Sequence, residues 1–180
     1  LSAFNSSSYL VSKMAFTLND FETVSKKIEI NNKLNLSDFR DQMISSIILE
    51  NFHIGNELSL RILNIDKEDQ EALIMHFSFL LLNNLKIDKI SYEIKNNQNS
   101  LINFIFFNGN KIKTYQEISN SLIEILQLNY YDFSNSGNLN YSFILFYLSL
   151  STYFDAENDQ ALFLKAQTYQ MMKNYNQAIY

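Results

Sequence analysis

The sequence predicts an all-α protein in which antiparallel helix hairpins stack on one another to form an α-solenoid. Three observations lead to this fold class. Apolar residues recur with helical spacing along most of the 180-residue chain, an acidic turn sequence occurs twice, and an aromatic–small pair recurs after polar turns. Because a single hairpin cannot bury its apolar face alone, repeats of this kind stack into a continuous core.

Helical spacing divides most of the chain into helix-length segments. Ile44, Ile47 and Ile48, for example, fall on one face of a helix with a period of about 3.6 residues. The two most apolar runs, ALIMHFSFLLL and YSFILFYLSLSTYF, are shorter than the roughly 20 residues that a membrane span needs, so both are predicted to be buried helices. The predicted helices lie near 8–18, 20–32, 37–50, 54–65, 69–83, 87–95, 114–131, 140–153, 159–172 and from 175 onward.

A repeated turn sequence is the clearest internal signal. DKEDQEALI at Asp66–Ile74 is echoed by DAENDQALF at Asp155–Phe163, and each copy follows one apolar run and precedes another. Acidic residues suit the positive N-terminal end of the helix that follows them. Each copy is therefore predicted to be a turn between two helices, and the echo indicates an internal repeat.

A second recurring pattern is an aromatic residue followed three positions later by a small or β-branched one. It occurs in Phe21–Val24, Phe52–Gly55 and Tyr175–Ala178, each time just after a polar turn. Where two helices cross closely, a small side chain lets the backbones approach, and an aromatic ring fills the space beside it. Chance is the alternative, since the chain has 15 Phe and 11 Tyr, but the matching positions favour a repeat.

The segment Ile90–Tyr115 allows two interpretations. The dipeptide Asn108–Gly109 lies among β-favouring residues and could form the turn of a β-hairpin. Leu101–Phe107 could equally form a short helix that ends at Gly109. We favour the helix, because a lone hairpin would have little to pair with in a solenoid.

The final segment, DQALFLKAQTYQMMKNYNQAIY, resembles the tetratricopeptide repeat (TPR), a unit of about 34 residues that folds as two antiparallel helices. Ala161, Ala166, Tyr169 and Ala178 occupy the small and aromatic positions of the family, whereas Ala156 stands where the family usually has Pro. SYLVSKMAFTLNDFETVSKKIEI and DFRDQMISSIILENFHIGNELSLRILNIDKED look like two further units. The order of these units also resembles a group of TPR proteins from alphaproteobacteria.

The resemblance implies a right-handed superhelix of TPR-like hairpins in a single segment over 1–180. Its hairpins would lie near 8–32, 37–65, 69–95, 114–153 and 159–180. The last one stops after the first turn of its second helix, and the chain starts with Leu1 instead of Met, so we expect a fragment of a longer bacterial protein. A soluble protein of the cytoplasm or periplasm is expected.

Composition argues against several functional classes. The net charge is −5 and the basic residues are scattered, which disfavours nucleic-acid binding. There is no Cys, the two His have no partner at ligand spacing, and the three Gly are isolated, so we expect no metal site and no phosphate-binding loop. We also expect no cofactor, no catalytic residues and no small-molecule substrate. The protein is predicted not to be an enzyme.

The predicted function is protein–protein interaction or assembly scaffolding, because the first helices of a TPR stack line a concave groove that binds peptides. The alternatives are an accessory repeat region of a larger enzyme or transferase, whose catalytic domain lies outside this chain, and a purely structural segment. Ile44, Ile47 and Leu81 also face the predicted groove, but packing explains them more simply. By resemblance, the residues that face the groove are Tyr9, Lys13, Phe16, Arg40, Glu71, Ser78, Phe163, Gln167 and Gln170.

Overall fold

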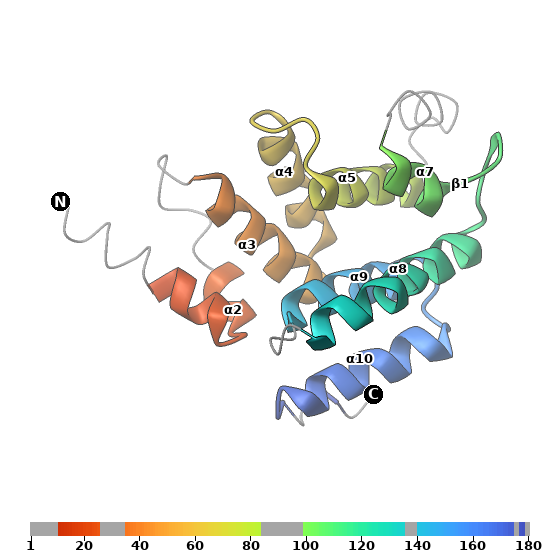
Figure 1. Ribbon diagram of the computed structural model, residues 1–180. Coiled ribbons are helices and arrows are strands. Elements are labelled where there is room, and N and C mark those ends of the chain that lie inside the picture. Colours follow the sequence, from red (N-terminus) through yellow and green to blue (C-terminus); the bar gives the residue numbers. More distant parts are fainter. Residues whose placement is uncertain (1–10, 26–34, 84–98, 136–139, 175–176, 179–180) are drawn as a thin grey trace.

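A computed structural model confirms the all-α class (Figure 1). It describes residues 11–25, 35–83, 99–135, 140–174 and 177–178, and at 129–135 it describes the backbone only. Residues 11–17 form a first helix. The elements that follow are α2 (Phe21–Ser25), α3 (Leu36–Ile48), α4 (Phe52–Leu63), α5 (Gln70–Leu82), α7 (Ser100–Phe106), β1 (Phe107–Asn108), β2 (Lys111–Ile112), α8 (Tyr115–Asn135), α9 (Tyr141–Phe154) and α10 (Asp159–Met171). The predicted helix at 87–95 lies outside the described residues, and those predicted at 20–32 and from 175 onward are described only in part.

The predicted helix boundaries are close to the observed ones because polar side chains cap the helix N-termini. Asn35 and Asp38 form a capping box at the start of α3, in which each side chain accepts a hydrogen bond from the backbone N–H of the other residue, at 3.0 and 3.1 Å. Asn140 caps α9 by accepting from the N–H of Phe143 at 3.2 Å. These short-range contacts satisfy N–H groups that have no partner within the helix.

The repeated turn sequence forms the same structure twice, which confirms its prediction as a turn between helices. In each copy the first Asp accepts a hydrogen bond from the N–H two residues later, and the side chain three residues after that Asp caps the next helix. The alanine that follows is fully buried in both copies. The matched pairs are Asp66 Oδ1 with Glu68 N, Asp155 Oδ1 with Glu157 N, Asp69 Oδ1 with Ala72 N, and Asn158 Oδ1 with Ala161 N.

The two most apolar runs are buried helices, as predicted. They form α5 and α9, and α9 lies among α3, α5, α8 and α10, all of which contact it (Figure 1). Leu145, Phe146, Leu148 and Leu150 of α9 are completely inaccessible to solvent. A helix that is apolar on every side has to be covered on every side. In the described part of the chain, no helix has both the length and the apolar character that crossing a membrane requires.

The linear stacking order expected of a solenoid is not confirmed. Two of the predicted hairpins are present, since α3 packs on α4 and α8 packs on α9. In a solenoid, however, each hairpin contacts only its neighbours in sequence, whereas α9 also contacts α3. A cluster of Phe21, Ile48, Leu145 and Tyr169 likewise joins α2 and α3 to α9 and α10. The late helices therefore fold back onto the early ones, because α9 needs cover on the side that α8 leaves open.

A buried polar contact holds α8 against α9. The hydroxyls of Ser119 and Ser151 lie 2.7 Å apart, and each also lies within hydrogen-bonding distance of the other residue's backbone carbonyl, at 3.0 and 3.1 Å. Asn158, the cap of α10, donates to the Ser119 hydroxyl at 3.0 Å. Small side chains at a crossing let two helices approach closely, and reciprocal hydrogen bonds satisfy the buried hydroxyls.

The segment 99–115 contains both of the structures that its sequence allowed. The favoured helix is present as α7, capped by Asn99. The predicted helix end at Gly109 is wrong, because α7 ends at Phe106 and the chain continues directly into the hairpin β1–β2. Gly109 instead occupies the hairpin turn with φ of 61°, a left-handed conformation that suits glycine. Residues 90–98 lie outside the described part of the chain.

Gly55 confirms the role predicted for the small residue of its aromatic–small pair. A Cβ atom at this position of α4 would lie 2.9 Å from Cγ1 of Ile47 on α3 and 3.5 Å from Cε of Met75 on α5. Ile47 and Met75 are both fully buried. The absence of a side chain at Gly55 thus lets three helices meet. In the pair Phe21–Val24, both side chains are buried as well.

Gly55→Val should lower the free energy of unfolding by roughly 1–3 kcal/mol, because a tightly packed core has to shift to accept added atoms. Urea denaturation of the full chain, followed by circular dichroism, measures the change. Leu60→Val, at an exposed position of the same helix, is the matched control and should change stability by less than about 0.5 kcal/mol. Equal stability of the two variants would contradict the close helix contact at Gly55.

Candidate functional site

Several of the residues predicted to face a groove do gather around one cleft. This cavity of about 510 Å³ lies between the helix at 11–17, α3, the start of α5 and the start of α9, and we call it the α3–α5 cleft. Phe16, Arg40, Ile44 and Glu71 all line it. Residues that are distant in sequence thus share a surface. The polar contacts around the cleft show which of its charged side chains are engaged within the fold.

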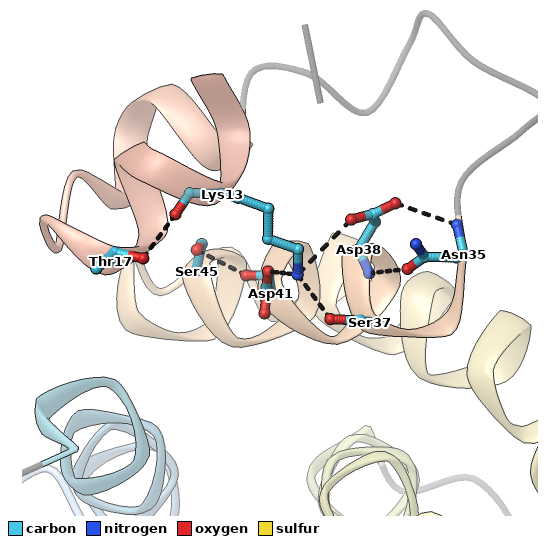
Figure 2. Close-up of polar contacts among 7 residues, drawn as sticks. All are labelled: Lys13, Thr17, Asn35, Ser37, Asp38, Asp41 and Ser45. Carbon is cyan, nitrogen blue, oxygen red and sulfur yellow. Dashed lines mark hydrogen bonds and ion pairs between the residues drawn. The ribbon is translucent and has the colours of Figure 1, made fainter. Parts of the chain in front are cut away.

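Lys13 is held by α3 and spans two helices (Figure 2). Its ammonium forms an ion pair with Asp41, donates to the Ser37 hydroxyl at 2.6 Å and lies 3.7 Å from the Asp38 carboxylate. Asp38 belongs to the capping box of α3, so the same carboxylate joins helix capping and helix packing. Lys13 therefore ties the helix at 11–17 to α3.

Arg40 ties α3 to the first copy of the repeated turn. Its Nε donates to the carboxylate of Asp69, and its Nη2 lies 3.5 Å from Asp66. The Asp69 side chain is inaccessible to solvent and also caps α5. A buried carboxylate needs this combination of a cation and hydrogen bonds to offset its lost hydration. Arg40 thus has a structural role at the edge of the cleft.

Two carboxyl groups of the α3–α5 cleft hold their protons more tightly than usual. Burial raises the pKa of Glu71, and the neighbouring charge of Asp69 adds to this effect while Arg40 opposes it. Burial also raises the pKa of Asp41, although the hydrogen bond and charge of Lys13 act in the opposite direction. In both groups desolvation is the largest effect, because a partly dry site disfavours the charged form. The charges around this cleft thus serve mainly to hold α3 to its neighbours.

The remaining predicted residues do not reach this cleft. The prediction that Ser78 faces a groove is wrong. Ser78 is fully buried within α5, because neighbouring helices cover this side of the helix. Phe163, Gln167 and Gln170 are exposed on α10 but line neither of the two clefts described here. Tyr9 lies outside the described residues. Ile47 and Leu81 are buried, as the packing explanation predicts.

A second and larger depression, which we call the α10 groove, has a volume of about 930 Å³. Its walls are the segment 18–22, the turn between α3 and α4, the end of α9, and α10. Three leucines on its walls are exposed: Leu18 by 73%, Leu49 by 39% and Leu162 by 36%. They come from three separate parts of the chain. Exposed apolar side chains that gather in one depression are typical of interaction sites.

Aromatic rings add to the lining of the α10 groove. Phe52 at the start of α4 stacks on Tyr153 of α9, with the ring centroids 3.6 Å apart and the planes inclined by 12°. Tyr169 of α10 is buried, and burial raises its pKa to about 12, helped by the nearby charge of Glu50. Its hydroxyl is therefore protonated at neutral pH. Rigid rings give the groove a lining that loses little entropy on binding.

The charged residues of the α10 groove are predominantly acidic. Asp20, Glu22 and Glu50 line it, together with a single Lys, Lys165. The ammonium of Lys165 lies 2.9 Å from Glu50 and links α10 to the turn after α3. Asp20 accepts a hydrogen bond from the N–H of Thr23 and so caps α2. The groove thus combines exposed leucines with charged side chains that also hold its walls together.

The α10 groove was not among the predicted surfaces. Binding residues were expected on the first helices of hairpins, whereas the groove combines residues of several helices with the turns that follow the helix at 11–17 and α3. A signal was present, since Leu18 and Leu49 each follow directly after a helix and lead into a polar turn. Their positions, with leucine where a polar turn residue is usual, could have indicated a surface role.

The two histidines lie outside both clefts. In the part of the chain that the structure describes, no three His, Cys, Asp or Glu residues lie where they could hold a metal ion together. His76 shares a hydrogen bond of 3.0 Å with Asn56, and exposed His53 lies 3.6 Å from Glu57 on the same helix.

Asp69→Ala should destabilise the protein by about 1–2 kcal/mol, because it removes the cap of α5 along with the partner of Arg40. Asp69→Asn keeps a capping oxygen and removes only the charge, so it should be clearly less destabilising. Urea denaturation of both variants measures the difference. If Asn were as harmful as Ala, the ion pair, and not the cap, would be the main contribution of Asp69.

Glu71→Gln should stabilise the protein at pH 7. Because burial raises the pKa of Glu71 in the folded state, its favourable effect is complete below the ordinary Glu pKa of about 4.3 and is lost as the pH rises through the raised value. The gain from Gln should therefore shrink between pH 7 and pH 4. Urea midpoints across this range test the prediction, and Glu57→Gln, at an exposed site of α4, is the control.

In comparisons with known proteins, no family model matches this chain, and no curated protein and no solved structure matches it either. The resemblance to TPR proteins stays a prediction. What the protein does has to be argued from its own surfaces.

Proposed function

We propose that this protein is an interaction module that holds a segment of a partner protein in the α10 groove. One observation carries the proposal: Leu18, Leu49 and Leu162 come from three parts of the chain and are exposed in the same depression of about 930 Å³. Binding sites are concave and predominantly apolar, with a few polar groups that orient the ligand. The α10 groove is concave and places these apolar side chains beside polar and charged ones.

The leucines and rings suggest where the binding energy would come from. Covering an exposed leucine contributes up to about 1.5–3 kcal/mol, and the three leucines of the groove together offset part of the cost of association. The stacked pair Phe52–Tyr153 offers a flat apolar surface for a partner side chain. A partner segment with regularly spaced apolar side chains fits this arrangement.

The polar groups of the groove favour binding over catalysis. Lys165 is engaged by Glu50, and Tyr169 keeps its proton at neutral pH. Catalytic groups usually need a pKa close to the working pH and a proton-transfer partner in reach. The groove instead offers charges suited to orienting a partner.

TPR-like architecture and an assembly role form part of the same proposal. The packed pairs α3–α4 and α8–α9 support it, as do the two equivalent turns. The contact between α9 and α3 implies that the hairpins close on one another instead of forming an extended stack. The binding surface would then be the α10 groove and not the face of α10 that carries Gln167.

Site-specific photo-cross-linking in cells that make the protein tests this proposal. A benzophenone amino acid at position 162 should cross-link a partner protein, which mass spectrometry then identifies. The same amino acid at position 67, an exposed site outside both clefts, should not. Position 167 tests the surface that the TPR resemblance implies.

The double variant Leu18→Ser/Leu49→Ser provides the specificity control. Both leucines are exposed, so their replacement should leave the thermal unfolding temperature nearly unchanged while it abolishes the cross-link at position 162. A cross-link at 167 but not at 162 would place the binding surface on the outer face of α10. If position 162 gave no cross-linked partner at all, the proposal would be wrong.

A further inference from the structure

We propose that the outer face of α10 joins two copies of this chain in an antiparallel helix pair with two-fold symmetry. The outer face consists of the exposed residues on the side of α10 away from α9, which are Gln160, Phe163, Gln167, Gln170 and Met171. None of them lines the α10 groove. The second copy is therefore a partner in addition to the one that the groove is proposed to hold.

The outer face is uncovered in the described part of the chain. The buried side of α10, which carries Ala161 and Tyr169, packs on α9, and α10 lies at the lower edge of the molecule in Figure 1. Phe163 is 67% exposed and Met171 is 47% exposed. Ala178, beyond the helix, packs against the cluster that contains Tyr169, on the side opposite the outer face. Two large apolar side chains thus face solvent on one side of this helix.

The outer face carries no charge. Its polar residues are all glutamines, and the one charged residue between Gln160 and Met171 is Lys165, which Glu50 holds with only 14% of its side chain exposed. Each copy of the chain has a net charge of −5, so two copies repel each other wherever their carboxylates meet. An uncharged face is the surface on which this repulsion is weakest. A lipid surface fits it less well, because helices that lie on membranes expose Lys or Arg.

The order of side chains along the outer face is self-complementary. Phe163 and Met171 lie about one helical turn on either side of Gln167. In an antiparallel pair with its two-fold axis at Gln167, each Phe163 lies opposite Met171 of the second copy. A thioether beside an aromatic ring is a favourable contact, and the two Gln167 amides, which both donate and accept, meet at the axis. The same patch therefore serves both copies.

The charges at the two ends of α10 suit the same arrangement. Asp159 begins the helix, and Lys173 is exposed just after its last turn. Antiparallel pairing brings Asp159 of each copy close to Lys173 of the other, so opposite charges attract at both ends. It also places the N-terminal end of each helix dipole beside the C-terminal end of the other. A parallel pair would instead bring like charges together.

Sedimentation equilibrium of the full chain, from about 1 µM to about 500 µM, tests whether two copies associate. A single helix pair buries less than the roughly 1,200 Å² of a stable complex, so we expect the monomer mass at the low end and the dimer mass at the high end. The monomer mass at every concentration would overturn the proposal. A mass that rises beyond the dimer would contradict closed two-fold pairing.

Opposite charges introduced at the two apolar positions test the register. Phe163→Lys and Met171→Glu should each weaken association at least about tenfold, because each removes an apolar contact. In the double variant Phe163→Lys/Met171→Glu, the new charges face each other across the axis, so association should be at least about threefold tighter than in either single variant. Both positions are exposed, so circular dichroism should show an unchanged fold. A double variant as weak as the single ones would contradict the antiparallel register.

Single-cysteine variants show which positions meet, because the chain has no Cys of its own. With Gln167→Cys, the two thiols lie at the axis, and a mild oxidant should join the copies through a disulfide. Gln160→Cys is the matched control on the same face, since its two thiols lie about 21 Å apart in this pair and should stay reduced. Equal disulfide formation at both positions, or none at position 167, would overturn the proposed pairing.

The variant Leu18→Ser/Leu49→Ser distinguishes this dimer from the proposed function. Both leucines line the α10 groove and neither belongs to the outer face, so the variant should associate as the unmodified chain does. Loss of association would show that the copies meet through the groove, and the proposal for the outer face would be wrong. A photo-cross-link at position 167 should likewise contain this chain alone, whereas one at position 162 should contain the partner protein.

Discussion

Burial of the middle of α9 organises the packing of the other helices. Residues 145–151 are all buried, so α3, α5, α8 and α10 have to cover this part of the helix between them. The serine contact between Ser119 and Ser151 sets how closely α8 approaches, and Asn158 links the same contact to the start of α10. Because α3 and α10 cover the same helix, the turn after α3 is brought beside α10, and the α10 groove lies between them.

The two clefts differ in what their charges do. Around the α3–α5 cleft, Lys13 and Arg40 hold α3 to the helix at 11–17 and to the turn after α4, so their charges are engaged within the fold. In the α10 groove the one lysine is paired and mostly covered, while Glu50 stays exposed. The proposed binding surface is therefore the one whose leucines stay exposed.

Much of the local structure could be predicted because its causes lie within a few residues. Helix ends follow from caps such as Asn35 and Asn158, and the repeated turn follows from side chains that bond to nearby N–H groups. The close helix contact at Gly55 could be predicted because an aromatic residue precedes this glycine by three positions. Ser78 was wrongly predicted to face a groove. The spacing of apolar residues along α5 does not reveal which neighbouring helices cover it, and these helices bury Ser78.

The helices, their caps, the equivalent turns and the need to bury α5 and α9 follow from the amino-acid sequence alone, since periodicity and local hydrogen bonding act over short distances. The contact of α9 with α3, the ion pairs of Lys13 and Arg40, and the groove shared by Leu18, Leu49 and Leu162 arise only when the chain folds. These features join residues far apart in the chain. Their contacts depend on how several apolar faces cover one helix together, and no single segment specifies that arrangement.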